Sequence, residues 1–318
     1  TSSEREAVVV SDPKESAQQC RSKQSWKGSF VTEKNRQVGV IGLGLMGTAI
    51  AERLLEHGYR ASIWNRTRDK AEAFLARGAV WSDNPLAECE RVIVSLYSSD
   101  VVAEVLTPRL GGVRAGQIVI DTTTGDPEQS VVWEKRLRER GAHYLDAPIS
   151  GSSEQTRRGE ATVIVGGDRA AFSACEDLWP VLGKNVFHVG ASGSAAKMKL
   201  VSNLVLGLNR AALAEGLAFA EALGLDAHGT LQVLQASAAY SRQMDTKGRK
   251  MIDNDFLTQA KLSQHLKDVG LILQAAAAHG LKLQITDAHR QLLGRAEAMG
   301  LGDLDNSAII QAVRSRIS

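Results

Sequence analysis

The segment between residues 37 and 58 constrains the fold of this 318-residue chain more than any other. A short run rich in β-branched residues, at positions 38–41, leads directly into the glycine-rich sequence GLGLMG at positions 42–47. Apolar residues then recur at helical spacing, and Gly58 follows where a helix would end. A buried strand, a tight turn and a helix in that order open a βαβ unit, so the pattern predicts an α/β domain.

The three glycines of this loop have the spacing of a dinucleotide-binding turn. Gly42 can make the turn after the strand, Gly44 lets a pyrophosphate approach the backbone, and Gly47 permits close packing of helix on strand. The phosphates would lie at the helix N-terminus, where free N–H groups and the positive end of the helix dipole face an anion. We therefore assign cofactor binding to the loop residues Gly42, Leu43, Gly44, Leu45, Met46 and Gly47.

The end of the second predicted strand, residues 60–64, bears on which dinucleotide binds. An acidic residue at this place binds the ribose 2′-hydroxyl and repels a 2′-phosphate. The chain has instead Asn65, Arg66 and Thr67, and the guanidinium of Arg66 can hold a 2′-phosphate. We assign these three residues to cofactor binding and expect NADP(H) to be preferred. The alternative, that Arg66 and Arg68 are solvated loop charges and NAD(H) is used, stays open because the acid is missing in either case.

Strand-like runs alternate with helix-like segments up to about residue 193. This alternation predicts a Rossmann-type, doubly wound parallel sheet with helices on both faces. The later predicted strands are residues 91–96, 117–121, 144–147, 162–166 and 185–189, and the predicted helices among them are residues 69–77, 127–140 and 169–182.

Strand-like runs disappear after residue 193. Residues 195–223 are rich in Ala, Leu, Met and Glu and contain no proline, which predicts one long helix between two domains. Residues 229–238, 260–279, 286–299 and 307–316 are also predicted helices. We expect an NAD(P)-binding Rossmann domain at residues 37–193 and an all-helical domain for substrate binding and oligomerisation at residues 194–318.

The first 36 residues differ in composition from the rest. They are polar, with one apolar run at residues 7–10, and cannot bury enough apolar surface to fold alone. They match neither a secretory signal, which needs a longer apolar stretch, nor an acid-poor transit peptide. We expect an extension that takes no part in the chemistry.

Charge, hydropathy and motif content argue against several classes of protein. The net charge is +2, with 38 Lys and Arg against 36 Asp and Glu, so no global field attracts nucleic acid or an anionic membrane. No apolar run approaches the roughly 20 residues that span a bilayer. The three cysteines form no CxxC pair, which suits a reducing cytoplasm, and the chain has neither HExxH nor GxSxG. We expect a cytoplasmic protein that uses no metal.

Five motifs occur together, in an order that points to a family. They are GLGLMG followed by WNRT, DTTTGDP at residues 121–127, DAPISGS at residues 146–152, AAKMKLVSN at residues 195–203 and HLKD at residues 265–268. Together they resemble the β-hydroxyacid dehydrogenases from about residue 37 to the C-terminus. That family includes 3-hydroxyisobutyrate dehydrogenase, tartronate semialdehyde reductase and the glyoxylate/succinic semialdehyde reductases.

The resemblance implies a catalytic lysine and an asparagine four residues later on the long helix. Lys199 and Asn203 match that spacing, and positions i and i+4 share one helix face. Lys197 competes for the role, but two residues along a helix are about 200° of rotation, so it should point away from that face. An ammonium within hydrogen-bond reach can protonate the alkoxide that forms when hydride reaches a carbonyl, and can act as the base in reverse.

The family pattern also implies residues that bind the acid group of the substrate and further cofactor contacts. The substrate residues are Thr123, Ser150, Gly151 and Ser152. Ser152 replaces the usual second glycine, so its side chain either narrows the carboxylate site or adds a donor to it. The further cofactor residues are Leu96, Tyr97, Thr124 and Lys267. The alternatives are turn-forming roles for the serine and threonine motifs and a plain ion pair for Lys267.

The expected activity is hydride transfer between NAD(P) and a small acid. Candidate substrates are 3-hydroxyisobutyrate, glyoxylate, succinic semialdehyde and tartronate semialdehyde. Two other functions stay open: an imine reductase, which would lack the lysine and the DAPxSG segment, and a non-catalytic NADP-binding scaffold, which would lack the lysine. The chain retains both features. Exposed hydrophobic helices of the second domain predict a homodimer or homotetramer, as the family resemblance also implies, and the balanced charge predicts no nucleic-acid or membrane partner.

Overall fold

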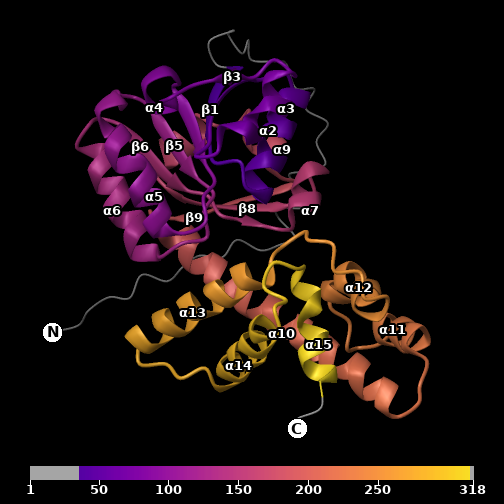
Figure 1. Cartoon of the computed structure of the whole chain (residues 1–318). Coiled ribbons are helices and arrows are strands. Elements are labelled where there is room, and N and C mark those ends of the chain that lie inside the picture. Colours follow the sequence, from indigo (N-terminus) through magenta and orange to yellow (C-terminus); the bar gives the residue numbers. More distant parts are fainter. Residues whose placement is uncertain (1–35, 316–318) are drawn as a thin grey trace, which may run out of the picture. The chain divides into compact units, whose positions relative to one another are not determined.

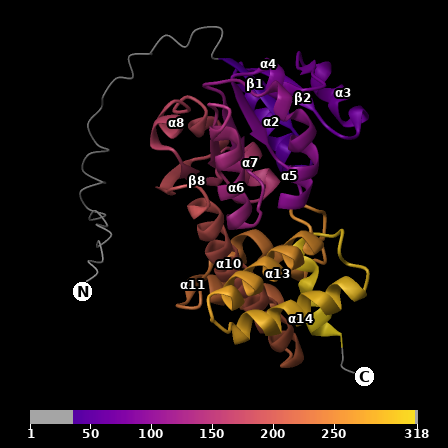
Figure 2. The same ribbon diagram turned by 90° about the vertical axis from the view of Figure 1, so that its left-hand side faces the viewer.

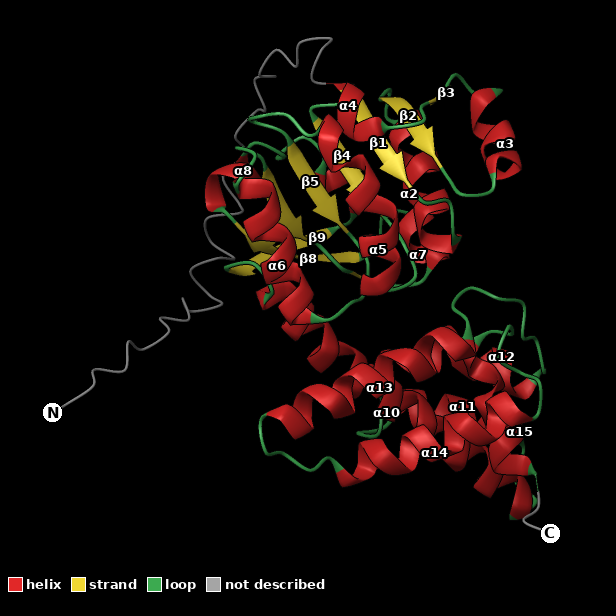
Figure 3. Ribbon diagram, turned by 60° about the vertical axis from the view of Figure 1, so that its left-hand side comes forward, coloured by secondary structure: helices red, strands yellow, loops and turns green. Residues whose placement is uncertain are grey.

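The computed structural model describes residues 36–315, so the expectations for the extension before residue 36 lie outside the described residues. Within this stretch all named strands end by Gly190, and helices follow from Ser194 onward (Figure 1). Figure 3 shows that the strands lie together in one half of the structure, surrounded by helices, and that the other half contains helices and loops. The strands are β1 (Gln37–Ile41), β2 (Arg60–Trp64), β3 (Val80–Trp81), β4 (Arg91–Val94), β5 (Ile118–Asp121), β6 (His143–Asp146), β7 (Ile149–Ser150), β8 (Thr162–Gly167) and β9 (Asn185–Gly190).

These strands form one sheet, with the order β3-β2-β1-β4-β5-β6-β8-β7 and with β9 beside β8. β1 to β6 pair in parallel, as predicted for a Rossmann-type fold. β8 is antiparallel to β6 and β7, so the sheet is mainly parallel, as predicted, and departs from parallel pairing at this edge. β7 and β8 follow each other in the chain and are connected through the five-residue α7 (Ser153–Arg157), and antiparallel neighbours can be joined by such short connections.

The strand order reverses at β1. The chain passes from β1 to β2 on one side and returns to β4 on the other. In open α/β sheets, ligands bind at the carboxyl ends of the strands where the order reverses. The expected ligand position therefore lies where the glycine loop follows β1 and residues 95–97 follow β4.

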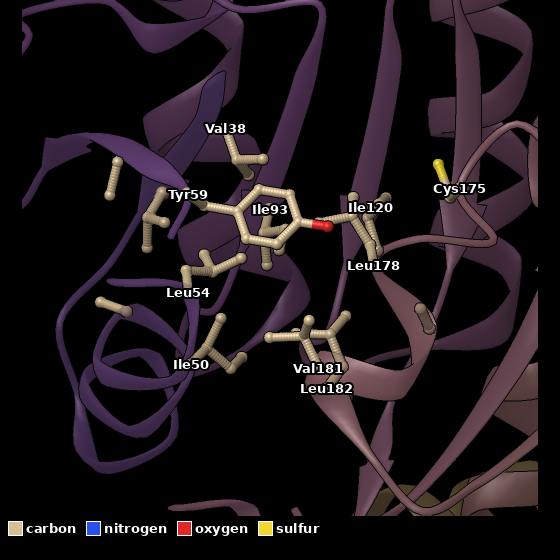
Figure 4. Close-up of a cluster of buried hydrophobic side chains, with 14 of the residues drawn as sticks. Val38, Ile50, Leu54, Tyr59, Ile93, Ile120, Cys175, Leu178, Val181 and Leu182 are labelled. Atoms are coloured by element: carbon tan, nitrogen blue, oxygen red, sulfur yellow. The ribbon is translucent and has the colours of Figure 1, made fainter. Parts of the chain in front are cut away.

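Apolar clusters cover the two faces of the sheet. On one face the ring of Tyr59 lies among Val38, Leu54 and Ile93 (Figure 4). On the other face Trp133 belongs to a second buried cluster. Each fully buried Val, Leu or Ile contributes about 1.5–3 kcal/mol, so these clusters hold the strand ends in place. The helices of this half are α2 (Leu45–Glu56), α3 (Glu72–Leu75), α4 (Pro85–Glu88), α5 (Ser99–Leu106), α6 (Pro127–Arg138), α7, α8 (Arg169–Ser173) and α9 (Trp179–Leu182).

The predicted helix at residues 169–182 is wrong in one respect, because the structure has two short helices, α8 and α9. Pro180 lies in the first turn of α9. Proline cannot donate a hydrogen bond in a helix interior but is well suited to a first turn, so a new helix begins at Trp179.

A single helix of 29 residues, α10 (Ser194–Ala222), links the sheet to the helical half. It contacts β8 and β9 near its start and α11, α13, α14 and α15 further along (Figure 2). Its predicted limits, residues 195–223, are confirmed within one residue at each end. The remaining helices are α11 (Ala227–Ala236), α12 (Arg249–Ile252), α13 (Leu262–Ala278), α14 (Gln284–Ala298) and α15 (Ile309–Arg314).

Candidate functional site

The glycine loop has the local geometry that close approach of a phosphate group needs. Gly42 has a φ of +101°, and a Cβ there would lie 2.3 Å from the Ser95 carbonyl oxygen. A Cβ on Gly47 would lie 2.0 Å from the Gly42 carbonyl oxygen, so the helix packs directly on the turn. A Cβ on Gly44 would meet no described atom within 4 Å, and Gly44 provides no side-chain cap for α2. The first N–H groups of α2 are therefore accessible to an anion.

The side chain of Asn65 connects the glycine loop to the turn after β2 by hydrogen bonds. Its Oδ1 accepts a hydrogen bond from the Leu43 N–H at 2.9 Å, and its Nδ2 donates to the Thr67 carbonyl at 2.7 Å. The glycine loop and the turn after β2 are thus joined through one amide. The prediction that Asn65 contacts the cofactor remains untested, while its contact with the loop is evident.

Arg66 projects from this turn and is exposed. Within residues 36–315 it has no ion-pair partner, whereas Arg68 stacks over the Trp81 ring at 4.8 Å. No acidic side chain follows β2 directly. The turn thus presents one accessible guanidinium where a dinucleotide carries its ribose.

The segments after β4 and β5 are joined to each other. The Leu96 N–H donates to Thr123 Oγ1 at 3.1 Å, and the Thr123 N–H donates to Asp121 Oδ1 at 2.9 Å. Burial raises the pKa of Asp121 to about 6, although its hydrogen bonds from Thr123 and Tyr144 oppose the rise. Thr123 is itself buried, so its hydroxyl is held in a fixed position.

Lys267 of α13 binds both of these segments. Its Nζ donates to the Tyr97 carbonyl at 2.9 Å and to the Thr124 carbonyl at 2.8 Å, and lies 5.3 Å from the centre of the Tyr97 ring. It also pairs with Asp268 Oδ1 at 3.0 Å. The structure therefore brings together three of the predicted cofactor residues, Tyr97, Thr124 and Lys267, from distant parts of the chain.

Lys199 lies on the buried face of α10, with 6% of the residue exposed. Its Nζ donates to the Ile149 carbonyl in β7 at 2.8 Å. Burial lowers the pKa of Lys199 to about 8, the Asp268 carboxylate opposes this change, and the charge of Lys267 adds to it. Lys197, the competing lysine, is exposed on the other side of the helix. A pKa of about 8 suits proton transfer near neutral pH, and the Lys199 ammonium is on the buried face of α10.

Asn203 follows Lys199 on the same buried face, as the spacing predicts. Its Nδ2 donates to Asp268 Oδ2 at 3.0 Å. Asp268 is buried, and burial raises the pKa of its carboxyl while Lys267 and Lys199 lower it. The Asp268 carboxylate therefore contacts the amide of Asn203 and the ammonium of Lys267, and its charge also acts on Lys199.

The predicted acid-binding segment lies beside this group. Ser150 Oγ is 3.3 Å from Ser202 Oγ of α10. The Ser152 hydroxyl accepts from the Gln155 N–H at 3.2 Å, and Gln155 Oε1 accepts from the Ser152 N–H, so Ser152 forms a capping box for α7. The departure from glycine at position 152 thus has a local structural role.

Two residues that are absent from the sequence-based assignments take part in this group. Asp268 and Ser202 contact Asn203 and Ser150, respectively. A signal for Asp268 was present in the sequence, because polar side chains at positions 265 and 268 interrupt the apolar face of α13 at helical spacing. Ser202 gave no signal, since its neighbour comes from a strand 52 residues away.

Within the described residues no group of three or more His, Cys, Asp or Glu side chains has the arrangement of a metal site. The same part of the chain contains no helix with the length and apolar character needed to cross a membrane.

Two family models match the chain. Residues 37–190 match the NAD binding domain of 6-phosphogluconate dehydrogenase. Residues 193–313 match a model described as NAD-binding of NADP-dependent 3-hydroxyisobutyrate dehydrogenase.

Individual proteins resemble the chain over nearly its whole described length. Glyoxylate/succinic semialdehyde reductase 1 of Arabidopsis thaliana is 31% identical over 87% of this chain and 98% of its own. 2-(Hydroxymethyl)glutarate dehydrogenase of Eubacterium barkeri is 32% identical over 88% of this chain and 95% of its own. The structure of Mycobacterium tuberculosis 3-hydroxyisobutyrate dehydrogenase with L-serine has a TM-score of 0.80 at 25% identity, covering 88% of this chain and 99% of its own.

Proposed function

Because this chain belongs to the β-hydroxyacid dehydrogenase family, we propose that it reduces a small semialdehyde acid and that Lys199 donates the proton. Family membership makes the chain an NAD(P)-dependent oxidoreductase that interconverts a CH–OH group and a carbonyl. The observation that carries the residue assignment is the buried Lys199 ammonium, anchored on Ile149 directly before the acid-binding segment.

The cofactor would be held by the glycine loop, the turn after β2 and the segments after β4 and β5. The open space at Gly44 and the uncapped N-terminus of α2 fit a pyrophosphate. A bound nicotinamide cofactor supplies the hydride. Lys267 supports the position of the nicotinamide end, because it ties the Tyr97 and Thr124 segments together.

Proton transfer is the task of the lysine. As hydride adds to the aldehyde carbon, negative charge develops on the aldehyde oxygen, and the Lys199 ammonium gives that oxygen its proton. With a pKa of about 8, Lys199 is largely protonated at pH 7 and can return to that state without a metal. Asn203 and Asp268 hold the helix face around the ammonium in one arrangement.

The acid group of the substrate would be bound by Thr123 and by the segment Ser150, Gly151 and Ser152. The Ser150 and Ser202 hydroxyls share one hydrogen bond, which leaves the other hydroxyl proton for a carboxylate oxygen. The Arabidopsis and Eubacterium relatives are named for acids that carry an aldehyde or hydroxymethyl group. Glyoxylate, succinic semialdehyde and tartronate semialdehyde are the first substrates to test, with 3-hydroxyisobutyrate for the reverse direction.

A preference for NADP(H) is supported by Arg66. Its guanidinium is exposed without an ion-pair partner among the described residues, and no acid follows β2 that would repel a 2′-phosphate.

The test of the proposed function is a spectrophotometric panel of these acids, each with NADPH and with NADH. We expect turnover of at least one semialdehyde acid, with kcat/KM higher for NADPH than for NADH. Turnover of cyclic imines with none of the acids would support an imine reductase instead. Cofactor binding without turnover of any acid or imine would support a scaffold.

We also propose that the chain forms homodimers or homotetramers. The face of α10 opposite Lys199 exposes apolar side chains at helical spacing, and a second copy would cover them. They are Met198, Val201, Val205 and Phe219. Light scattering after size exclusion tests this expectation, and Val205→Asp should shift the population towards monomers.

A cytoplasmic location and small-molecule partners complete the proposal. Cys89 and Cys175 are free and buried, which suits a reducing compartment, and the balanced charge offers no field for nucleic acid or membranes. Cell fractionation and a DNA and liposome binding assay test these two expectations.

A further inference from the structure

Asp146 ends β6 and is almost completely buried, with 2% of the residue exposed. Its carboxylate points at the start of α10, 47 to 50 residues away in the chain. Oδ1 accepts from the Gly193 N–H at 3.0 Å, and Oδ2 accepts from the Ala196 N–H at 2.9 Å. One side chain therefore serves two backbone N–H groups at the beginning of the helix that carries Lys199.

This helix start has no capping side chain of its own. Gly193 occupies the N-cap position with a φ of +87°, in the left-handed region. Ala195 and Ala196 are buried, so water cannot take the place of a capping group. An anion at this place also complements the positive end of the helix dipole.

The surroundings allow the carboxylate little movement. A Cβ on Gly166 would lie 2.7 Å from Asp146 Oδ1 and 3.0 Å from the Ala195 nitrogen. The strand β8, the Asp146 carboxylate and the first turn of α10 are therefore in direct contact at this glycine.

The same short segment also holds the tip of the lysine. Ile149, three residues after Asp146, accepts the hydrogen bond from Lys199 Nζ, and Lys199 follows Ala196 by three residues. Residues 146–149 thus contact α10 at two places. The Asp146 carboxylate binds the first turn of the helix, and the Ile149 carbonyl binds the Lys199 ammonium.

We propose that Asp146 is a positioning residue for the reaction, because its carboxylate fixes the first turn of α10 and thereby the place of the Lys199 ammonium. This inference rests on the proposed role of Lys199. It assigns the aspartate of the DAPISGS segment a task distinct from acid binding, which belongs to the serines of that segment.

The proposal has a consequence for pH dependence. Removal of a negative charge at the start of α10 leaves the helix dipole uncompensated near Lys199, which disfavours the ammonium and lowers the pKa of Lys199. The groups that face Lys199 from α13 are Asp268, Lys267 and His265. Asp121 pairs with Asp146 from the neighbouring strand β5, and Tyr144 lies on β6 two residues before Asp146; burial raises the pKa of all three.

The test compares Asp146→Asn and Asp146→Glu with the wild type in the full-length protein. Asp146→Asn keeps the size of the side chain and removes its charge. We expect kcat for semialdehyde reduction to fall about tenfold to a hundredfold, with the dissociation constant of NADPH unchanged, and the alkaline limb of the kcat profile to move to lower pH. Asp146→Glu keeps the charge. The alkaline limb of its kcat profile should therefore stay at the wild-type pH, although its kcat falls.

The matched control is Asp177→Asn. Asp177 is a carboxylate of the sheet half that binds Tyr59 and Arg91 and does not contact α10. This variant should lose stability without moving the pH limb. The inference would be overturned if Asp146→Asn folds and the alkaline limb of its kcat profile stays at the wild-type pH. Failure of both Asp146 variants to fold would also overturn it. Normal turnover by Lys199→Met would overturn the proposed function instead, so the two failures are distinguishable.

Discussion

The glycine loop (residues 42–47) and the lysine face of α10, which consists of Lys199 and Asn203, differ in how their charged and polar groups are partnered. The loop presents backbone N–H groups and open space at Gly44, next to an exposed Arg66. At the other region, Lys199 and Asn203 are buried, with Lys199 hydrogen-bonded to the Ile149 carbonyl and Asn203 to the Asp268 carboxylate. The glycine loop can therefore accept an anionic ligand, whereas the positive charge of Lys199 is balanced by a carboxylate of the protein itself.

The two regions should therefore tolerate different substitutions. At the loop, the backbone contacts at Gly42 and Gly47 limit side-chain volume. Around Lys199, the charges of Lys199 and Asp268 each alter the pKa of the other group, so loss of one charge should change the pKa of the other. Substitutions in the loop should therefore affect cofactor affinity, and substitutions at the lysine face should affect kcat and its pH dependence.

The largest effect is expected at Lys199. Lys199→Met removes the proton donor, so kcat should fall about 10²- to 10⁴-fold while NADPH binding, measured by fluorescence titration, stays within a factor of two. Lys197→Met is the matched control, because Lys197 is exposed on the other side of the helix. If kcat fell equally in Lys199→Met and Lys197→Met, the assignment of Lys199 as the proton donor would be contradicted.

The next largest effect is expected at Gly47. A methyl group there would collide with the Gly42 carbonyl oxygen, so Gly47→Ala must displace the turn and should weaken NADPH binding by about a hundredfold. Gly44→Ala separates the structural from the binding role, because its methyl group has space in the free protein. Its melting temperature should match the wild type while its NADPH affinity falls. Unchanged affinity in Gly44→Ala would show that the phosphates lie elsewhere.

A smaller, selective effect is expected at Arg66. Arg66→Ala removes a charge-assisted hydrogen bond to a 2′-phosphate, so the KM for NADPH should rise about tenfold and that for NADH should change little. Arg68→Ala is the control, since Arg68 stacks on Trp81. A parallel loss for both dinucleotides would favour the NAD(H) alternative.

The smallest effect is a displacement of the pH profile. Reduction needs the Lys199 ammonium, so kcat should decline as pH rises through about 8, and oxidation of the alcohol should increase over the same range. The Asp268 carboxylate raises the pKa of Lys199. In Asp268→Asn, the fall of the reduction rate and the rise of the oxidation rate should therefore both occur at lower pH, by about one unit or less. A displacement to higher pH would contradict this arrangement of charges.

Much of the fold could be predicted because its signals are local. The strand, glycine loop and helix lie within about twenty residues, and the long helix lacks any residue that would end it before Ala222. The break between α8 and α9 was missed although Pro180 marks it, because apolar spacing alone does not show where a helix begins. The antiparallel edge was missed because pairing direction depends on connection geometry, which hydrophobic patterns do not encode.

The Rossmann-type sheet, the helical half and the family could be predicted from motifs whose residues lie close together in the chain. The partners of the buried charges could not, because they come from distant segments. Asp146 at the start of α10, Asp268 beside Asn203 and Lys267 on the Tyr97 and Thr124 carbonyls each join segments at least 47 residues apart. The physical reason is that a buried charge must find a partner in space, and packing of the core brings that partner from anywhere in the chain.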